Sequence, residues 1–152
     1  MVRACSIELL ALTENPELVK TFSACLADEN PRVRLAALCA QTRLGDDAAR
    51  TELARLYRET SLSDAERIRV LLELIRRPAE TELDIYREAA LNVKLPNALR
   101  SVAVVALGSV GNETETQTLE AIVADTKLPE DLRSAAQGAL EAIHARVKPS
   151  GN

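Results

Sequence analysis

The chain has 152 residues, of which 47% are hydrophobic and only 2% aromatic, and it carries a net charge of −4. This length allows one domain with a sizeable core, and the apolar fraction excludes a disordered polypeptide. The scarcity of aromatic residues argues against a β-sandwich or barrel, and the acidic balance argues against binding to a nucleic-acid phosphate backbone.

An aliphatic residue followed by arginine recurs along the chain and marks a repeated helix. The arginines are separated by 31, 35, 31 and 33 residues, a near-constant period of the kind found in helical repeat proteins. Apolar residues recur at offsets −1, +2, +3, +6, +7 and +10 from the arginine, which fall on one side of a helix. The marked positions are Arg3, Arg34, Arg69, Arg100 and Arg133.

In chain order, the sequence predicts a half repeat over residues 1–14 and then four helix pairs. The first helices of the pairs are expected over Pro16–Ala27, Asp47–Arg58, Glu80–Leu91 and Glu115–Asp125. The second helices carry the marker arginines, and their start signals are Pro31, Pro96, Pro129 and a capping box of Ser63 with Glu66. Gly45 and Gly111 are expected as C′ glycines. Short connections favour antiparallel neighbours, so we expect an all-α stack of nine helices.

Two stretches, Asp28–Asp46 and Leu99–Asn112 (LRSVAVVALGSVGN), resemble repeats of the HEAT family, in particular the short bacterial PBS-lyase HEAT-like repeats. The resemblance implies a right-handed alpha-alpha superhelix, a HEAT-like solenoid of about 4.5 helical hairpins. It would form a single domain over residues 1–147, followed by a frayed tail at 148–152. In that family the second helix of each pair lines the concave face, and the usual role is scaffolding or partner binding. The repeat at Arg69 departs most, because it lacks the alanine pair and the terminal glycine.

Offsets +1, +4, +5 and +8 lie opposite the apolar side of the marked helices, yet they are largely apolar in the three middle ones. Two interpretations stay open. Neighbouring side chains bury this face, or it forms a concave apolar groove for a partner helix, a peptide or another copy of the chain. The predicted partner-binding residues are Leu35, Leu38, Thr42, Val70, Glu73, Leu74, Arg77, Ser101, Val104, Val105 and Gln137.

The repeated arginines and the cysteines receive structural interpretations. An arginine ladder could bind an acidic partner, but we expect each marker guanidinium to bond a carboxylate or a helix-end carbonyl of its own or the adjacent repeat. Asp28 matches the family's pairing with Arg34. Cys5 and Cys25 fall on the predicted core side, whereas Cys39 falls on the free face and could be reactive. Three cysteines without CxxC spacing and a single histidine make no zinc set, and reduced thiols indicate a cytoplasmic protein.

The leading hypothesis is therefore a non-enzymatic protein-interaction or scaffold module that binds a protein or peptide and needs no cofactor. No catalytic site, metal site, membrane contact or nucleic-acid contact is expected, since no catalytic motif and no membrane-spanning apolar run occurs. Self-association is a further partner hypothesis. One alternative is a bilin (tetrapyrrole) lyase-like or enzyme-associated subunit, because the most similar repeats resemble those of bilin lyases. Nucleic-acid binding, as in HEAT-like DNA glycosylases, is suggested only by Arg76 and Arg77.

Overall fold

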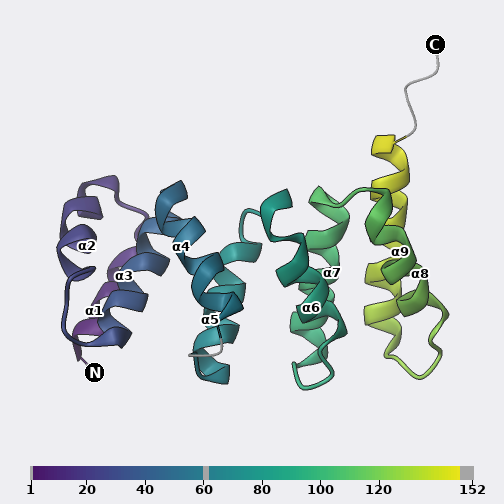
Figure 1. Cartoon of the computed structure of the whole chain (residues 1–152), viewed down its shortest axis with the longest axis horizontal. Coiled ribbons are helices and arrows are strands. Elements are labelled where there is room, and N and C mark those ends of the chain that lie inside the picture. The colour runs from purple at the N-terminus through teal and green to yellow at the C-terminus, as the bar shows by residue number, and fades with distance from the viewer. Residues whose placement is uncertain (1, 60–61, 148–152) are drawn as a thin grey trace, which may run out of the picture. The chain divides into compact units, whose positions relative to one another are not determined.

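The computed structural model describes residues 2–59 and 62–147, and within them the chain is helical and has no strand (Figure 1). The all-α prediction is confirmed, and these residues contain nine α-helices. Their bounds are α1 Val2–Ala11, α2 Val19–Cys25, α3 Pro31–Arg43, α4 Asp47–Arg58, α5 Asp64–Ile75, α6 Leu83–Leu91, α7 Asn97–Val110, α8 Thr116–Ala124 and α9 Glu130–Val147. Short 3₁₀ helices precede α2, α6 and α8, namely η1 Pro16–Leu18, η2 Glu80–Glu82 and η3 Glu113–Glu115. The predicted tail, 148–152, lies outside the described residues.

The local start and stop signals act largely as the sequence predicts. The bounds of α4 are the predicted ones, and η2 with α6 covers the predicted Glu80–Leu91. Pro31 occupies the first turn of α3, where its missing N–H leaves no bond unmade, and Ser63 forms a capping box with Glu66 at the start of α5. These features depend on neighbours in sequence, so a single sequence is enough to predict them.

The two predicted C′ glycines have different roles. Gly45 has φ of 95° and its N–H donates to the Thr42 carbonyl oxygen at 3.0 Å, as expected for a glycine that ends a helix in the left-handed region. For Gly111 the prediction is wrong, because φ is −70° and ψ is 165°. A Cβ at Gly111 would lie 2.4 Å from the Leu107 carbonyl oxygen, so lack of space accounts for the glycine there.

The structure sets the repeat period at 33 residues and corrects the predicted phase of α5. The second helices of the pairs begin at 33-residue intervals, at Pro31, Asp64, Asn97 and Glu130. The fourth residue of each helix is an arginine, namely Arg34, Arg67, Arg100 and Arg133. The marker of α5 is therefore Arg67, and the prediction that used Arg69 is wrong by two residues.

The first helix keeps the same period. The buried residues of α1 are Ala4, Ile7 and Ala11. They lie 33 residues before three positions on the core side of α3, namely Ala37, Ala40 and Leu44. The marker at Arg3 therefore also gave the wrong phase, and Leu9, which that phase placed in the core, is 66% exposed.

The marker arginines tie the second helix of a pair to the end of the helix before it. In three of the four, the guanidinium donates to a backbone carbonyl oxygen near that end, and the bonds are Arg34 to Asp28 (2.7 Å), Arg67 to Tyr57 (2.7 Å) and Arg100 to Ala90 (3.0 Å). A helix end leaves such carbonyls without intrahelical partners, so the predicted structural role is confirmed for Arg34 and Arg100. The Asp28 carboxylate itself pairs with Arg3 at 2.8 Å.

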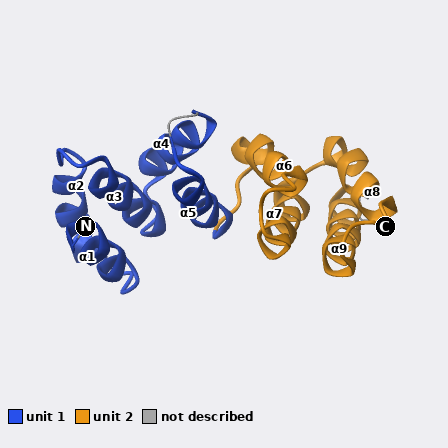
Figure 2. Ribbon diagram, turned by 90° about the horizontal axis from the view of Figure 1, so that it is seen from below, with its two compact units in different colours: residues 1–76 blue, residues 77–152 orange. Residues whose placement is uncertain are grey.

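The chain forms two compact units, Met1–Arg76 (unit 1) and Arg77–Asn152 (unit 2), which Figure 2 colours separately. In unit 1, α3 packs against α1, α2, α4 and α5, and Phe22 of α2 is fully buried with Ile7 and Ala40. In unit 2, α7 packs against α6 and α9, and Tyr86, Leu107, Leu119, Leu132 and Ile143 are buried. That residues 1–147 form one domain remains a prediction.

Candidate functional site

The structure places most of the predicted partner-binding residues away from solvent. Six are buried, namely Leu35, Thr42, Val70, Glu73, Leu74 and Val104. Two are half-buried, Leu38 and Ser101, and three are exposed, Arg77, Val105 and Gln137. The expectation that all of them form an open face is wrong, and the interpretation that neighbouring side chains bury this face holds for the six.

The error in α5 has a simple geometric cause. Counted from Arg67, the buried residues Val70, Glu73 and Leu74 occupy offsets +3, +6 and +7, which belong to the core side. A shift of two residues turns a helix by about 200°, so the wrong marker exchanged the inner and outer faces of α5. Leu72, which that phase assigned to the core, is 49% exposed.

In α3 and α7, neighbouring helices cover the predicted free face. Gly108 crosses α9 so closely that a Cβ there would lie 2.6 Å from Ala139, and the buried Val104 lies one turn earlier on the same side of α7. On α3, Leu35 and Leu38 line a cavity of about 730 Å³ together with α4 residues. Burial on α7 therefore reflects close packing against α9, whereas on α3 the half-buried Leu38 borders open space.

The exposed face of the second helices lies at offsets +2 and +5 from the marker arginines. Leu72 of α5 and Val102 and Val105 of α7 are the exposed large apolar residues at these offsets in the described part of the chain. In α3 the same offsets carry Ala36 and Cys39, which are buried. A 33-residue period read from the sequence would have located this face, whereas the unequal spacings of the aliphatic–arginine steps concealed it.

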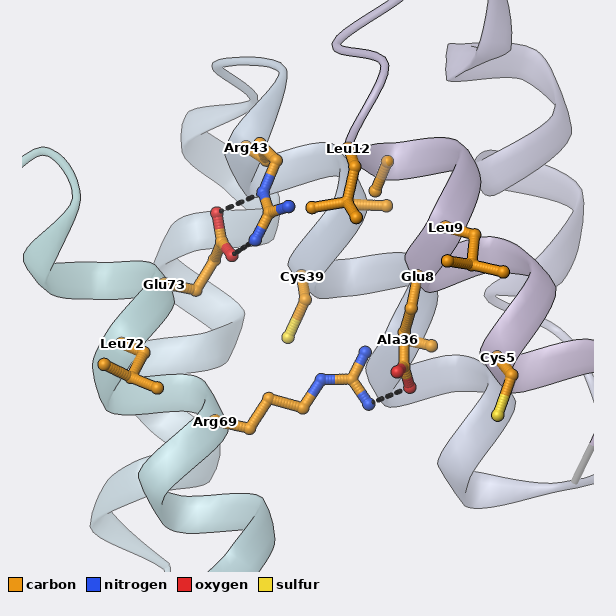
Figure 3. A pocket seen from close by; sticks show the side chains of 12 residues that line it. Cys5, Glu8, Leu9, Leu12, Ala36, Cys39, Arg43, Arg69, Leu72 and Glu73 are labelled. Carbon is orange, nitrogen blue, oxygen red and sulfur yellow. Dashed lines mark hydrogen bonds and ion pairs between the residues drawn. The ribbon is translucent and has the colours of Figure 1, made fainter.

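A pocket of about 490 Å³ lies over α3 in unit 1 (Figure 3). Ala36, Cys39 and Ala40 of α3 form its floor. α1 supplies one wall and α5 the other, so the lining comes from three helices that are distant in sequence. We call this pocket the unit 1 groove, and its wall residues are Cys5, Glu8, Leu9, Ala11, Leu12, Arg43, Arg69, Leu72 and Glu73.

Two ion pairs lie in the unit 1 groove. Arg43 binds both carboxylate oxygens of Glu73, through Nε at 3.2 Å and Nη2 at 2.6 Å. This hydrogen bonding raises the pKa of Arg43, and the bidentate geometry fixes both side chains. Arg69 reaches from α5 to Glu8 of α1 and so crosses above the α3 floor (Figure 3).

Beyond the groove lining, a third pair joins the same two helices. Arg76, which caps the C-terminus of α5, donates to Glu14 at 2.8 Å. Glu14 follows α1 in a turn and has φ of 50°, a left-handed conformation that is uncommon for a residue other than glycine. The segment from Glu8 to Glu14 is therefore held to α5 at both ends.

Cys5 and Cys39 differ from their predicted environments, whereas Cys25 packs half-buried against the hydrophobic core of unit 1, as expected. Cys39 is buried in the groove floor, and burial raises the pKa of its thiol to about 11. Arg69 and Arg43 oppose this shift and Glu73 adds to it, yet desolvation dominates. The thiol is therefore protonated at neutral pH, and the predicted reactivity at Cys39 is not supported. Cys5, expected in the core, is exposed on the groove wall.

Across residues 2–59 and 62–147, no cluster of three or more histidine, cysteine or acidic side chains is arranged to hold a metal ion. Within the same ranges, no helix combines the length and the apolarity that crossing a bilayer requires. In comparisons with known proteins, no protein-family model matches the chain, and no curated protein matches it.

Proposed function

We propose that the chain is a non-enzymatic interaction module of the HEAT-like solenoid type, a right-handed superhelix of helical hairpins, which binds a protein or peptide in the cytoplasm. The 33-residue spacing of helix starts supports this architecture. The repeated bond from a marker arginine to the preceding helix end supports it as well. Free cysteines at positions 5, 25 and 39 fit a reducing compartment.

The observation that carries the binding proposal is the unit 1 groove with its exposed leucines. Leu9 and Leu12 on one wall are 66% and 64% exposed, and Leu72 on the other is 49% exposed. Leucines gathered around a concave site expose apolar surface that association with another molecule would bury. The charged side chains between the helices would orient that molecule, as polar groups do in binding sites.

A peptide or helix fits the groove better than a reacting substrate does. The floor is apolar, and its one titratable group, the Cys39 thiol, is neutral at physiological pH. Arg43 and Glu73 bind each other in bidentate geometry, so neither is poised to transfer a proton. A groove of this kind offers apolar contacts and fixed charges, which are the means of peptide recognition.

The test is selection of peptides from a random library on the whole chain. Selected peptides should bind the double variant Leu12→Ser/Leu72→Ser at least tenfold more weakly than the wild type, since both leucines line the groove. The matched control is Leu91→Ser/Val93→Ser, which removes two residues of unit 2 that are 50% and 78% exposed. Equal binding to all three proteins, or an equal loss in both variants, would exclude the groove as the binding site.

A further inference from the structure

We infer that the unit 1 groove selects an acidic amphipathic helix, whose carboxylates bind Arg69 and Arg76 and whose leucines pack on Leu72. This inference rests on the proposed function and specifies the chemistry of the partner. The recognition element is the row Arg69–Leu72–Arg76 on α5, which we call the α5 row.

The α5 row has the spacing of one helix face. Its members stand at i, i+3 and i+7, so they follow one another along the same side of α5. At 1.5 Å per residue, the two arginines are about 10 Å apart along the helix axis. A partner helix packed alongside would present residues seven apart at the same spacing, with apolar residues between them.

The chain itself already holds such a segment across the groove from the α5 row, joined to it by ion pairs. Arg69 pairs with Glu8 and Arg76 with Glu14, and Leu9 and Leu12 lie between the two glutamates in sequence. Within unit 1, the complement of an arginine–leucine–arginine row is therefore an acidic–leucine–acidic segment. A partner of the same pattern would meet the same groups.

The two pairs on the α5 row are open to exchange, unlike the pair beneath them. Side-chain exposures are 32% and 43% for Arg69 and Glu8, and 48% and 58% for Arg76 and Glu14. For Arg43 and Glu73 they are 17% and 6%. Exposed pairs contribute little to stability, so a partner carboxylate can replace Glu8 or Glu14 at small cost.

The accessible charge favours an anionic partner over a cationic one. Glu73 lies between Leu72 and Arg76 in sequence but is almost fully covered, so the α5 row itself presents the partly exposed Arg69 and Arg76 and no exposed carboxylate. Glu8 and Glu14 belong to the α1 side of the groove. Each guanidinium has five N–H donors, and Arg69 uses them on Glu8 and on the Cys39 thiol, which leaves donors for a further carboxylate. A lysine-bearing helix would meet the same arginines and be repelled.

The experiment uses a 16-residue helical peptide with glutamates seven positions apart and two leucines between them, and a matched peptide with lysines in their place. Fluorescence anisotropy on the whole chain should show the acidic peptide binding at least tenfold more tightly. Arg69→Gln/Arg76→Gln should remove that preference. Arg55→Gln is the control, because Arg55 is an exposed arginine paired with Glu52 on α4, outside the groove.

A second variant gives an effect of opposite sign. Glu8→Gln/Glu14→Gln removes the competing carboxylates and should tighten binding of the acidic peptide severalfold, whereas recognition of a cationic helix would be weakened by the same change.

Equal or tighter binding of the lysine peptide, with loss of binding in Leu12→Ser/Leu72→Ser, would overturn the acidic preference and leave the proposed function standing. A single-stranded oligonucleotide that displaces the acidic peptide at equal concentration would also overturn it. If library peptides ignore the leucines as well, the proposed function fails too.

Discussion

In unit 1 the outward face of α3 is covered, whereas in unit 2 the same face of α7 is open. Ala36 and Cys39 are 1% and 5% exposed, while Val102 and Val105, 66 residues later at the same repeat positions, are 42% and 56% exposed. The covered pair includes a small alanine and the exposed pair consists of larger, branched side chains. Intrinsic hydrophobicity therefore does not explain the difference.

The side chains of neighbouring helices explain it. In unit 1, α1 and α5 flank α3, and Arg69 reaches across its face to Glu8 (Figure 3). Arg43 and Glu73 cover the next turn. A long charged side chain can shield apolar surface with its methylene groups while its charge stays near water. The position of a residue within a repeat therefore predicts which way its side chain points. The exposed fraction of that side chain depends on the side chains of the adjacent helices.

Thiol chemistry offers the largest expected contrast between the two faces. In a Cys5→Ser/Cys25→Ser background, Cys39 should react with a thiol reagent at neutral pH at least a hundredfold more slowly than a cysteine introduced by Val105→Cys. Burial raises the pKa of Cys39 from 9.0 to about 11, which lowers the thiolate fraction about a hundredfold, and the covering side chains restrict access further. Comparable rates in native buffer, measured by mass spectrometry, would mean that the α3 face is open.

The loss of stability on removing one carboxylate should distinguish the fixed Arg43–Glu73 pair from the exchangeable Arg69–Glu8 pair. Glu73→Ala should lower the free energy of unfolding by about 3 kcal/mol, because it leaves the largely covered Arg43 without its bidentate partner. Glu8→Ala removes the partner of a half-exposed arginine and should cost less than about 1 kcal/mol. Urea unfolding followed by circular dichroism measures both. A Glu8→Ala cost equal to that of Glu73→Ala would show that Arg69–Glu8 is a structural bond and not an exchangeable one.

Much of this fold follows from local sequence, and the errors arose where contacts are not local. The bounds of α4 and the Ser63 capping box depend on residues within one or two turns, and the sequence predicted both. The phase of α5 failed because Glu66 precedes its true marker, Arg67, whereas the aliphatic Ile68 precedes Arg69 and imitates the step seen elsewhere. This error of two residues exchanged the predicted buried and exposed faces of α5.

The candidate site was less predictable than the fold. Glu73 is buried in unit 1 because Arg43, 30 residues away, binds it, and nothing in the sequence around Glu73 indicates that partner. The α5 row likewise becomes recognisable only when Glu8 and Glu14, 61 and 62 residues from their arginines, are brought alongside. Of the predicted binding residues, Glu73 alone lines the unit 1 groove.

The last contrast in stability comes from one repeat position that packs differently in the two units. Thr42 of α3 and Gly108 of α7 are 66 residues apart, and both are buried. Gly108→Ala should cost about 1–2 kcal/mol, since overpacking against Ala139 costs about 1–3 kcal/mol and the gain in helix propensity returns up to about 1 kcal/mol. Thr42→Ala should change stability by less than about 0.5 kcal/mol, because the lost methyl contact is offset by removing a buried hydroxyl that lacks a hydrogen-bond partner.

The control for this pair is Gly138→Ala on the exposed side of α9. A Cβ at Gly138 would meet no atom within 4 Å, so only helix propensity acts, and the variant should be more stable by about 0.5–1 kcal/mol. Thermal unfolding of the three variants measures the order of their stabilities directly. If Gly108→Ala were as stabilising as Gly138→Ala, α7 and α9 could not cross as closely as the Gly108–Ala139 approach requires. The burial of Val104, one turn away on the same side of α7, would then need another cause.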